Sequence, residues 1–226
     1  MTEIKSRHIH DGWLSLTVIA VILIIDQIIK IEVKTTMSLG EAIRVTDWFY
    51  IEFIENNGMA YGMTLFNKLV LSIFRIIAVS AIGMFIYRLI KQNHSTGYLV
   101  CLSMVLAGAA GNIIDCMFYG LIFEPSTTYS VSSIVPFGEG YSTFLHGKVV
   151  DMFYFPIIQT TWPLWMPFCG GEEFVFFSPV FNFADACISV GVVLLLLFYR
   201  GELEKIGAVW HNRCGKTSGE AVGNDK

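Results

Sequence analysis

The residues most able to do chemistry are Asp151 and Asp185. Asp185 lies inside an apolar run that continues to Tyr199, and an ionised side chain within a membrane helix costs about 2.5–3.5 kcal/mol on insertion scales. Such a residue has a partner or a function, and we predict that its partner is Asp151. Two neighbouring carboxylates share a proton, so one can act as general base on a water while the other protonates the product. The pair predicts aspartic-type proteolysis, with a buried acid in a proton relay as the alternative.

Other polar residues stand near the ends of apolar runs. Asn112 and Asn182 either hold an extended peptide backbone or bond across helices, because amides both donate and accept hydrogen bonds. Asp26 and Lys30 are four residues apart, which places them on one helix face and predicts a structural ion pair. Asp115 is expected to brace its helix, with a catalytic role as the alternative.

Three further features have ordinary interpretations beside functional ones. Arg75 lies within an apolar run, where it either snorkels to the surface or neutralises one of the acids. Trp162 and Trp165 are typical of a segment at a membrane interface, rather than of a substrate sensor. His146 lacks the HExxH context of a zinc protease, so we expect a surface residue.

The composition indicates an integral membrane protein. The chain has 226 residues, of which 54% are hydrophobic and 15% charged, and its mean hydropathy is +0.59, whereas soluble domains carry about 25% charged residues. A net charge of −4 gives no basic surface for nucleic acid. Five cysteines without a CxxC pattern argue against a disulfide framework, a zinc site and a thiol-redox enzyme.

The apolar residues are concentrated in blocks of about 20, the length that crosses a bilayer as a helix. Between them, Trp48–Ile54 alternates as a strand does, and the region 120–178 contains prolines that exclude another straight span. We therefore predict one membrane-embedded domain, 1–205, and a polar tail, 206–226. Its helices are expected at 12–32, 69–90, 97–119 and 179–200, with outer regions at 33–67 and 120–178.

The orientation follows from the positive charges. Arg7, Arg88, Lys91 and Arg200 fall on one side if four helices alternate, and the positive-inside rule makes that side cytoplasmic. Both termini are then cytoplasmic and the two long regions lie outside. The unusual polar residues come together at the outer boundary, with Arg75 reaching toward them from two turns away. We expect one polar site built from all four helices.

Five sequence blocks in register resemble the lipoprotein signal peptidase (signal peptidase II) family, the aspartic peptidases of the bacterial inner membrane. Order, spacing from the helices and side of the membrane all agree, and the resemblance covers most of the chain. The blocks are Asp26–Lys30, Asn56–Tyr61, Gly111–Asp115, Val149–Phe153 and Phe181–Ile188.

The resemblance implies an all-α membrane protein of four transmembrane helices, with a small extracytoplasmic β-cradle and a long outer loop. It implies that Asp151 and Asp185 are catalytic, and that the substrate is a diacylglyceryl-modified prolipoprotein, cut before its lipidated cysteine at the periplasmic face. Membrane phospholipid and cyclic-peptide inhibitors are the other expected partners, without metal, organic cofactor or nucleic acid, and the protein is expected to be a monomer. Asn56, Gly58, Asn112, Asp115 and Asn182 match substrate-binding positions, supported by Asp26, Lys30 and Arg75.

Two departures from the family pattern matter. Many members carry arginine where this chain has Cys116, and Arg75 or Lys148 are the candidates to replace it. The outer region is also longer than compact members need, and we expect part of it, Glu124–Tyr141, to form a lid. Two other classes stay open. A proton-coupled transporter or pore would need charges along the membrane depth, and a non-catalytic lipoprotein-binding protein would tolerate loss of either aspartate.

Overall fold

The computed structural model describes residues 2–57, 68–92, 94–202 and 204. Its helices are α1 (Thr2–Thr36), α2 (Lys68–Lys91), α3 (Thr96–Ile114) and α5 (Phe183–Phe198). A π-helical turn, Asp115–Tyr119, continues α3 into the short helix α4 (Gly120–Ile122). The predicted tail 206–226 lies outside the described residues.

Three of the described helices are long and apolar enough to cross a membrane: α1 from Arg7, α2, and α3 with its continuation to Ile122. The fourth predicted span is present as α5, but at 16 residues it is shorter than the predicted 179–200. It begins late because the side chain of Asn182 caps it by accepting from the Asp185 backbone N–H. The expected count of four spans is therefore not confirmed, whereas α1 is longer than the predicted 12–32.

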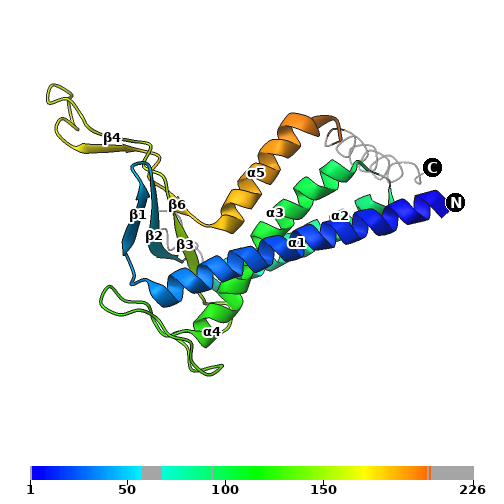
Figure 1. Cartoon of the computed structure of the whole chain (residues 1–226), viewed down its shortest axis with the longest axis horizontal. Helices are drawn as coiled ribbons and strands as arrows, with labels where there is room; N and C mark the ends of the chain where they lie inside the picture. The colour runs from blue at the N-terminus through cyan, green and yellow to red at the C-terminus, as the bar shows by residue number, and fades with distance from the viewer. Residues whose placement is uncertain (1, 58–67, 93, 203, 205–226) are drawn as a thin grey trace, which may run out of the picture.

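Helix α3 lies at the centre of the helices and packs against α1, α2 and α5 (Figure 1). Small residues allow this packing, because Ser103, Ala107 and Gly111 are all buried as their four-residue spacing predicts. At Gly108 the backbones of α3 and α5 approach closely, and a Cβ would stand 2.3 Å from the carbonyl oxygen of Ala184 in α5.

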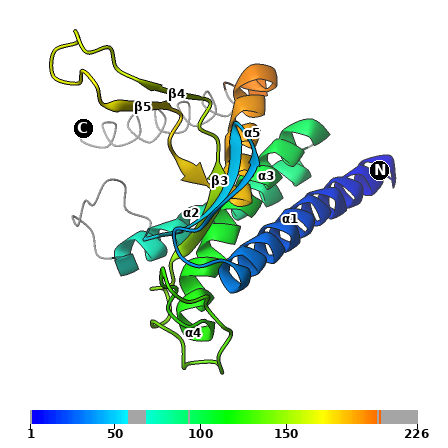
Figure 2. The ribbon, with the colours of Figure 1, turned by 60° about the vertical axis from the view of Figure 1, so that its left-hand side comes forward.

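A sheet of four antiparallel strands crosses the ends of α1 and α3 (Figure 2). The strands are, in spatial order, β1 (Ala42–Thr46), β2 (Phe49–Asn56), β3 (Val149–Tyr154) and β6 (Val180–Phe181). The predicted strand Trp48–Ile54 is confirmed as β2. Phe53, Val150 and Met152 are buried against Val33 of α1 and Tyr119 after α3, so the sheet closes the core at this end.

The expected all-α class is not confirmed, because the outer region 120–178 is not simply irregular. It contains β3 and a separate two-stranded hairpin, β4 (Ile158–Thr161) and β5 (Glu173–Phe176). The prolines exclude another straight span there, and short runs rich in aromatic and β-branched residues pair as strands. The segment expected as a lid, Glu124–Tyr141, is tied down at several points: Leu39 N–H donates to Thr127, and Tyr141 N–H donates to Phe123.

The close approach at Gly108 yields a stability prediction. We expect Gly108→Ala to lower the free energy of unfolding by about 1–3 kcal/mol, because the new methyl must displace the backbone of α5. Gly83→Ala in α2 is the matched control, since its Cβ meets only Leu106 at 3.9 Å, and alanine is the better helix former. Thermal unfolding of both variants in detergent tests this, and equal stability of the two would contradict it.

Candidate active site

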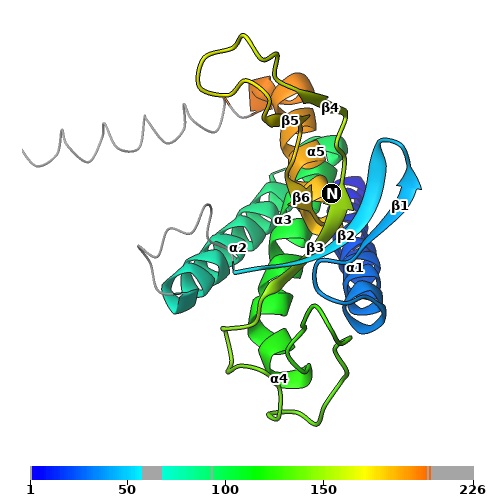
Figure 3. The ribbon, with the colours of Figure 1, turned by 90° about the vertical axis from the view of Figure 1, so that its left-hand side faces the viewer.

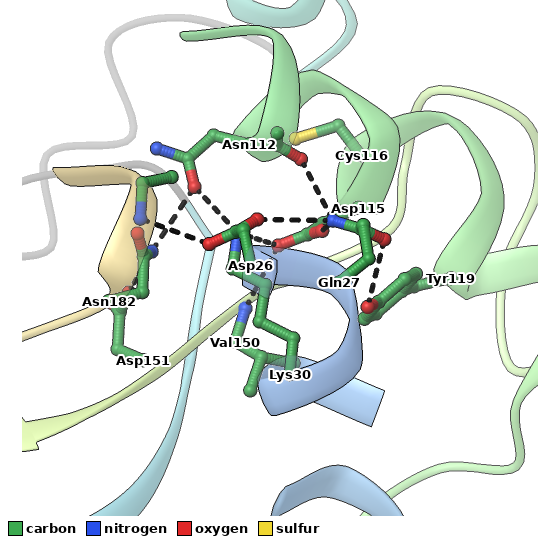
Figure 4. A network of polar contacts seen from close by, with 12 residues as sticks. Asp26, Gln27, Lys30, Asn112, Asp115, Cys116, Tyr119, Val150, Asp151 and Asn182 are labelled. Carbon is green, nitrogen blue, oxygen red and sulfur yellow. Dashed lines mark hydrogen bonds and ion pairs between the residues drawn. The ribbon is translucent and has the colours of Figure 1, made fainter. Parts of the chain in front are cut away.

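A buried lysine forms the centre of the polar network at the end of the helices (Figure 4). Lys30 Nζ lies 2.9 Å from Asp26 Oδ2 and 2.8 Å from Asp115 Oδ2, and none of the three side chains is exposed. The same ammonium donates to Asn112 Oδ1 at 2.9 Å. The predicted ion pair of Asp26 and Lys30 is confirmed, and Lys30 forms a second ion pair with Asp115.

This network joins α1 to three other elements. The backbone N–H of Ala184 in α5 donates to Asp26 Oδ1 at 3.0 Å, and the N–H of Val150 in β3 donates to Asp115 Oδ2 at 3.4 Å. Gln27 donates to Asp115 Oδ1 at 2.9 Å and accepts from the Tyr119 hydroxyl at 3.2 Å. Buried carboxylates need such partners, because leaving them unsatisfied costs several kcal/mol.

Asn112 and Asn182 connect the two candidate catalytic aspartates. Asn112 Nδ2 donates to Asp185 Oδ1 at 2.7 Å, and Asn182 Nδ2 donates to Asp151 Oδ1 at 2.7 Å. Asn182 Nδ2 also reaches Asn112 Oδ1 at 3.1 Å, so the four side chains form one continuous chain. Asn56 of β2 donates to the other oxygen, Asp151 Oδ2, at 3.1 Å. A strand and a helix therefore bring their carboxylates to one place.

The environment of Asp151 shifts its titration toward neutral pH. Burial, together with the negative charge of Asp185, raises the pKa of Asp151 to about 6, although the amides of Asn56 and Asn182 oppose the shift. A carboxyl group with a pKa near the working pH can both take and give a proton. The arrangement is suited to general acid–base chemistry.

Four other residues singled out in the sequence have different outcomes. Gly58 lies outside the described residues, so its predicted contact stays a prediction. Arg75 donates to Cys116 Sγ at 3.5 Å, which places a guanidinium beside the position where arginine was expected. Lys148, the other candidate, is instead paired with Glu55 at 2.7 Å. His146 bonds within its own loop, to Thr143 and Phe144.

A second buried ion cluster lies beside the site, and sequence reasoning missed it. Lys34 Nζ is 2.6 Å from Glu55 Oε1 and donates to Ser126 at 2.8 Å, while the ring of Tyr141 lies 5.1 Å away. Burial opposes ionisation of Glu55, but hydrogen bonds from Lys148 and Lys34 outweigh it and lower the pKa of Glu55. Lys34 is one helical turn beyond Lys30, and that spacing was the available signal.

Gln27 and Tyr119 were not assigned a role from the sequence either. Tyr119 is four residues after Asp115 and so shares its helix face. Gln27 is adjacent to Asp26, and only the fold shows that it faces α3.

The raised pKa of Asp151 predicts a pH-dependent stability. The native protein binds this proton more tightly than the unfolded chain, so the stability that it contributes is lost as pH rises from about 4 through about 6. The unfolding free energy of wild type minus that of Asp151→Asn should fall by up to about 3 kcal/mol between about pH 4 and pH 7. Unfolding measured across this range tests it.

Asp47→Asn is the control, because the Asp47 side chain is 86% exposed and should give a much smaller change. A constant difference between wild type and Asp151→Asn over the whole pH range would show that Asp151 titrates normally.

The chain matches known proteins over most of its length. The family model described as "Signal peptidase (SPase) II" matches residues 18–200. A protein named "Lipoprotein signal peptidase" from Porphyromonas gingivalis is 52% identical over 200 residues, covering 88% of this chain and 88% of that protein. One of the same name from Amoebophilus asiaticus is 36% identical and covers 80% of this chain and 75% of its own length.

Two solved structures, each titled as a bacterial membrane enzyme, share the fold. The first has a TM-score of 0.54 at 25% identity and covers 81% of this chain and 90% of that chain. The second has a TM-score of 0.56 at 23% identity, with coverage of 85% and 90%.

Proposed function

Since this chain belongs to the signal peptidase II family, we propose that it removes signal peptides from diacylglyceryl-modified prolipoproteins by aspartic-type hydrolysis, cleaving before the lipidated cysteine. The observation that carries the proposal is the hydrogen-bonded chain from Asp151 through Asn182 and Asn112 to Asp185. It supports two carboxyl groups acting together, one of them with a pKa near 6.

The chemistry follows from two carboxyl groups that differ in protonation. The ionised member takes a proton from a water, whose oxygen adds to the carbonyl carbon of the scissile bond, while the protonated member donates to the carbonyl oxygen. The two carboxyl groups, of Asp151 and Asp185, are here called the dyad. As the tetrahedral species collapses, the C–N bond breaks and the leaving nitrogen takes a proton from the dyad. The products are a new carboxyl end on the signal peptide and a free amine on the lipidated cysteine.

The surrounding residues hold the dyad in place. Asn56, Asn112 and Asn182 each donate to a dyad carboxylate and, as in the family positions they match, are proposed to contact the substrate backbone as well. Asp115 and Asp26 face Lys30, so their charge is compensated within the network. We assign both to support, together with Arg75 beside Cys116.

The proposed topology has four crossings in one domain, with both termini in the cytoplasm of a bacterial cell and the site at the periplasmic face of the inner membrane. Thr96 donates to Asp11 at 3.0 Å, and His94 lies 2.8 Å from Glu202. These contacts bring together the first turns of α1, the start of α3 and the residues after α5, at the end of the molecule opposite the site (Figure 1). The 16 residues of α5 extend about 24 Å as helix, most of the hydrocarbon core.

A proton-coupled transporter fits these observations less well. Its charged residues would be spread through the membrane depth, whereas Asp26, Lys30, Asp115 and Asp185 form one compact network. Phospholipid and cyclic-peptide inhibitors are the other proposed ligands of the site, and a monomer is the proposed state.

The dyad assignment predicts the result of a cleavage assay with a diacylated prolipoprotein in detergent. Asp151→Asn and Asp185→Asn should each reduce cleavage by about 10³-fold or more, because an amide cannot exchange the proton. Asp47→Asn, which alters an exposed carboxylate in the turn between β1 and β2, should cleave as wild type does. A gel shift between precursor and product measures all four proteins.

Cleavage that survives in one dyad variant would remove that residue from the dyad and make Asp115 the next candidate. If folded wild type binds the precursor without cutting it, the chain is a lipoprotein-binding protein and not a peptidase.

A further inference from the structure

A hairpin projects from the edge of the sheet and is here called the aromatic arm, residues 158–176. Its strands β4 and β5 pair only with each other among the described strands, from Ile158 opposite Phe176 to Thr161 opposite Glu173. An isolated two-stranded hairpin is at best marginally stable in water. The arm therefore needs another surface to hold it.

The tip of the arm is ordered and strongly apolar. It is folded by backbone bonds from Trp162 N–H to Glu172 and from Gly171 N–H to Trp162, and Trp162 packs on Phe174 at 4.8 Å. Leu164 is 89% and Trp165 79% exposed, and Phe168 is fully exposed. No charged residue occurs between Ile158 and Gly171.

The backbone at one of these exposed residues, Phe168, has a strained conformation. Phe168 has a φ of 77°, a region that residues other than glycine rarely occupy. A soluble protein would rarely keep such a strained aromatic residue fully exposed, together with two apolar neighbours, unless a partner covered them.

The arm is attached to the site through short connections. It is inserted between β3, which carries Asp151, and β6, which leads to Asn182. At its base, Phe155 stacks on Phe49 at 4.7 Å and on Phe181 at 5.6 Å, and Phe181 in turn meets Phe177 at 6.1 Å. This row of rings joins the base of the arm to β2 and β6.

The direction of the arm agrees with a membrane surface as its partner. Figures 1 and 3 show the arm projecting sideways, past α5, while the loop after α4 lies on the opposite side. The sheet from which it projects crosses the ends of helices long and apolar enough to span a membrane. Tryptophan and other apolar side chains without charge are the residues that insert at the bilayer interface.

We propose that the aromatic arm inserts Leu164, Trp165 and Phe168 into the outer leaflet of the membrane that the helices cross, and so holds β3 and β6 at the bilayer surface. This second anchor acts beside the helices and does not depend on the catalytic assignment. The occupant is the lipid itself rather than a second copy of the chain or another protein.

Cys169, within the tip and partly exposed, provides a native labelling position. The full chain with Cys214→Ser is labelled there with an environment-sensitive fluorophore and placed, one molecule per disc, in phospholipid nanodiscs. Phosphatidylcholine with a doxyl group near the head of its acyl chain then serves as the lipid quencher, and iodide as the aqueous one. The same preparation with Cys169→Ser measures labelling of the buried cysteines.

We expect the doxyl lipid to remove about half of the emission or more and iodide to have little effect, because the tip lies at the interface. Leu164→Ser, Trp165→Ser and Phe168→Ser combined should reverse this pattern. Tyr129→Ser is the matched control, since Tyr129 is 97% exposed in the other outer loop, and it should leave lipid quenching unchanged. Wild type quenched by iodide and not by doxyl lipid would overturn the proposal, as would lipid quenching that persists in the triple variant.

Discussion

The burial of Lys30 among Asp26, Asp115 and Asn112 is the interaction on which the rest of the site depends. An ammonium group can only donate hydrogen bonds, so it forces the oxygen of Asn112 toward itself. The amide nitrogen must then point the other way, at Asp185. One buried charge thus sets the orientation of a side chain that donates to Asp185, in addition to holding α1 and α3 together.

Asn182 is also oriented by a hydrogen-bond donor, in this case a backbone N–H. The backbone N–H of Asp185 donates to Asn182 Oδ1 as the helix cap, which directs the nitrogen at Asp151 and Asn112. The same Asn182 side chain therefore caps α5 and donates to Asp151. The second ion cluster stabilises β2, because Lys34 and Lys148 hold Glu55, the residue next to Asn56. Lys34 also connects α1 to Ser126 of the outer region.

Much of this site could be predicted from the sequence, because polar residues in apolar runs are conspicuous. Asp26, Lys30, Asn112 and Asp185 stand out for that reason, and their topology alone places them at one end. The contacts of Gln27 and Lys34 depend on which face of α1 meets α3 and the sheet, and hydrophobic periodicity is weak in a helix that is apolar all round.

The strands of the outer region were missed for a different reason. Their partners lie far away in the sequence, as when β3 pairs with β2 across about a hundred residues, and local pattern carries little of that information. The prolines indicate that the region holds no further straight span, but the strand pairing found there is decided by tertiary packing. The aromatic arm belongs to the same region, and the sequence predicted an interfacial position for its tryptophans without the hairpin that presents them.

The most direct test of the central role of Lys30 is a cycle of unfolding free energies in detergent, with Lys30→Met, the pair Asp26→Asn and Asp115→Asn, and all three changes together. Lys30→Met alone should cost about 3–5 kcal/mol, because it leaves two carboxylates buried without a cation. Neutralising Asp26 and Asp115 in the Lys30→Met background should recover much of that loss, so the triple variant is expected to be more stable than Lys30→Met alone. Losses that simply add would contradict the view that charge compensation around Lys30 holds the site together.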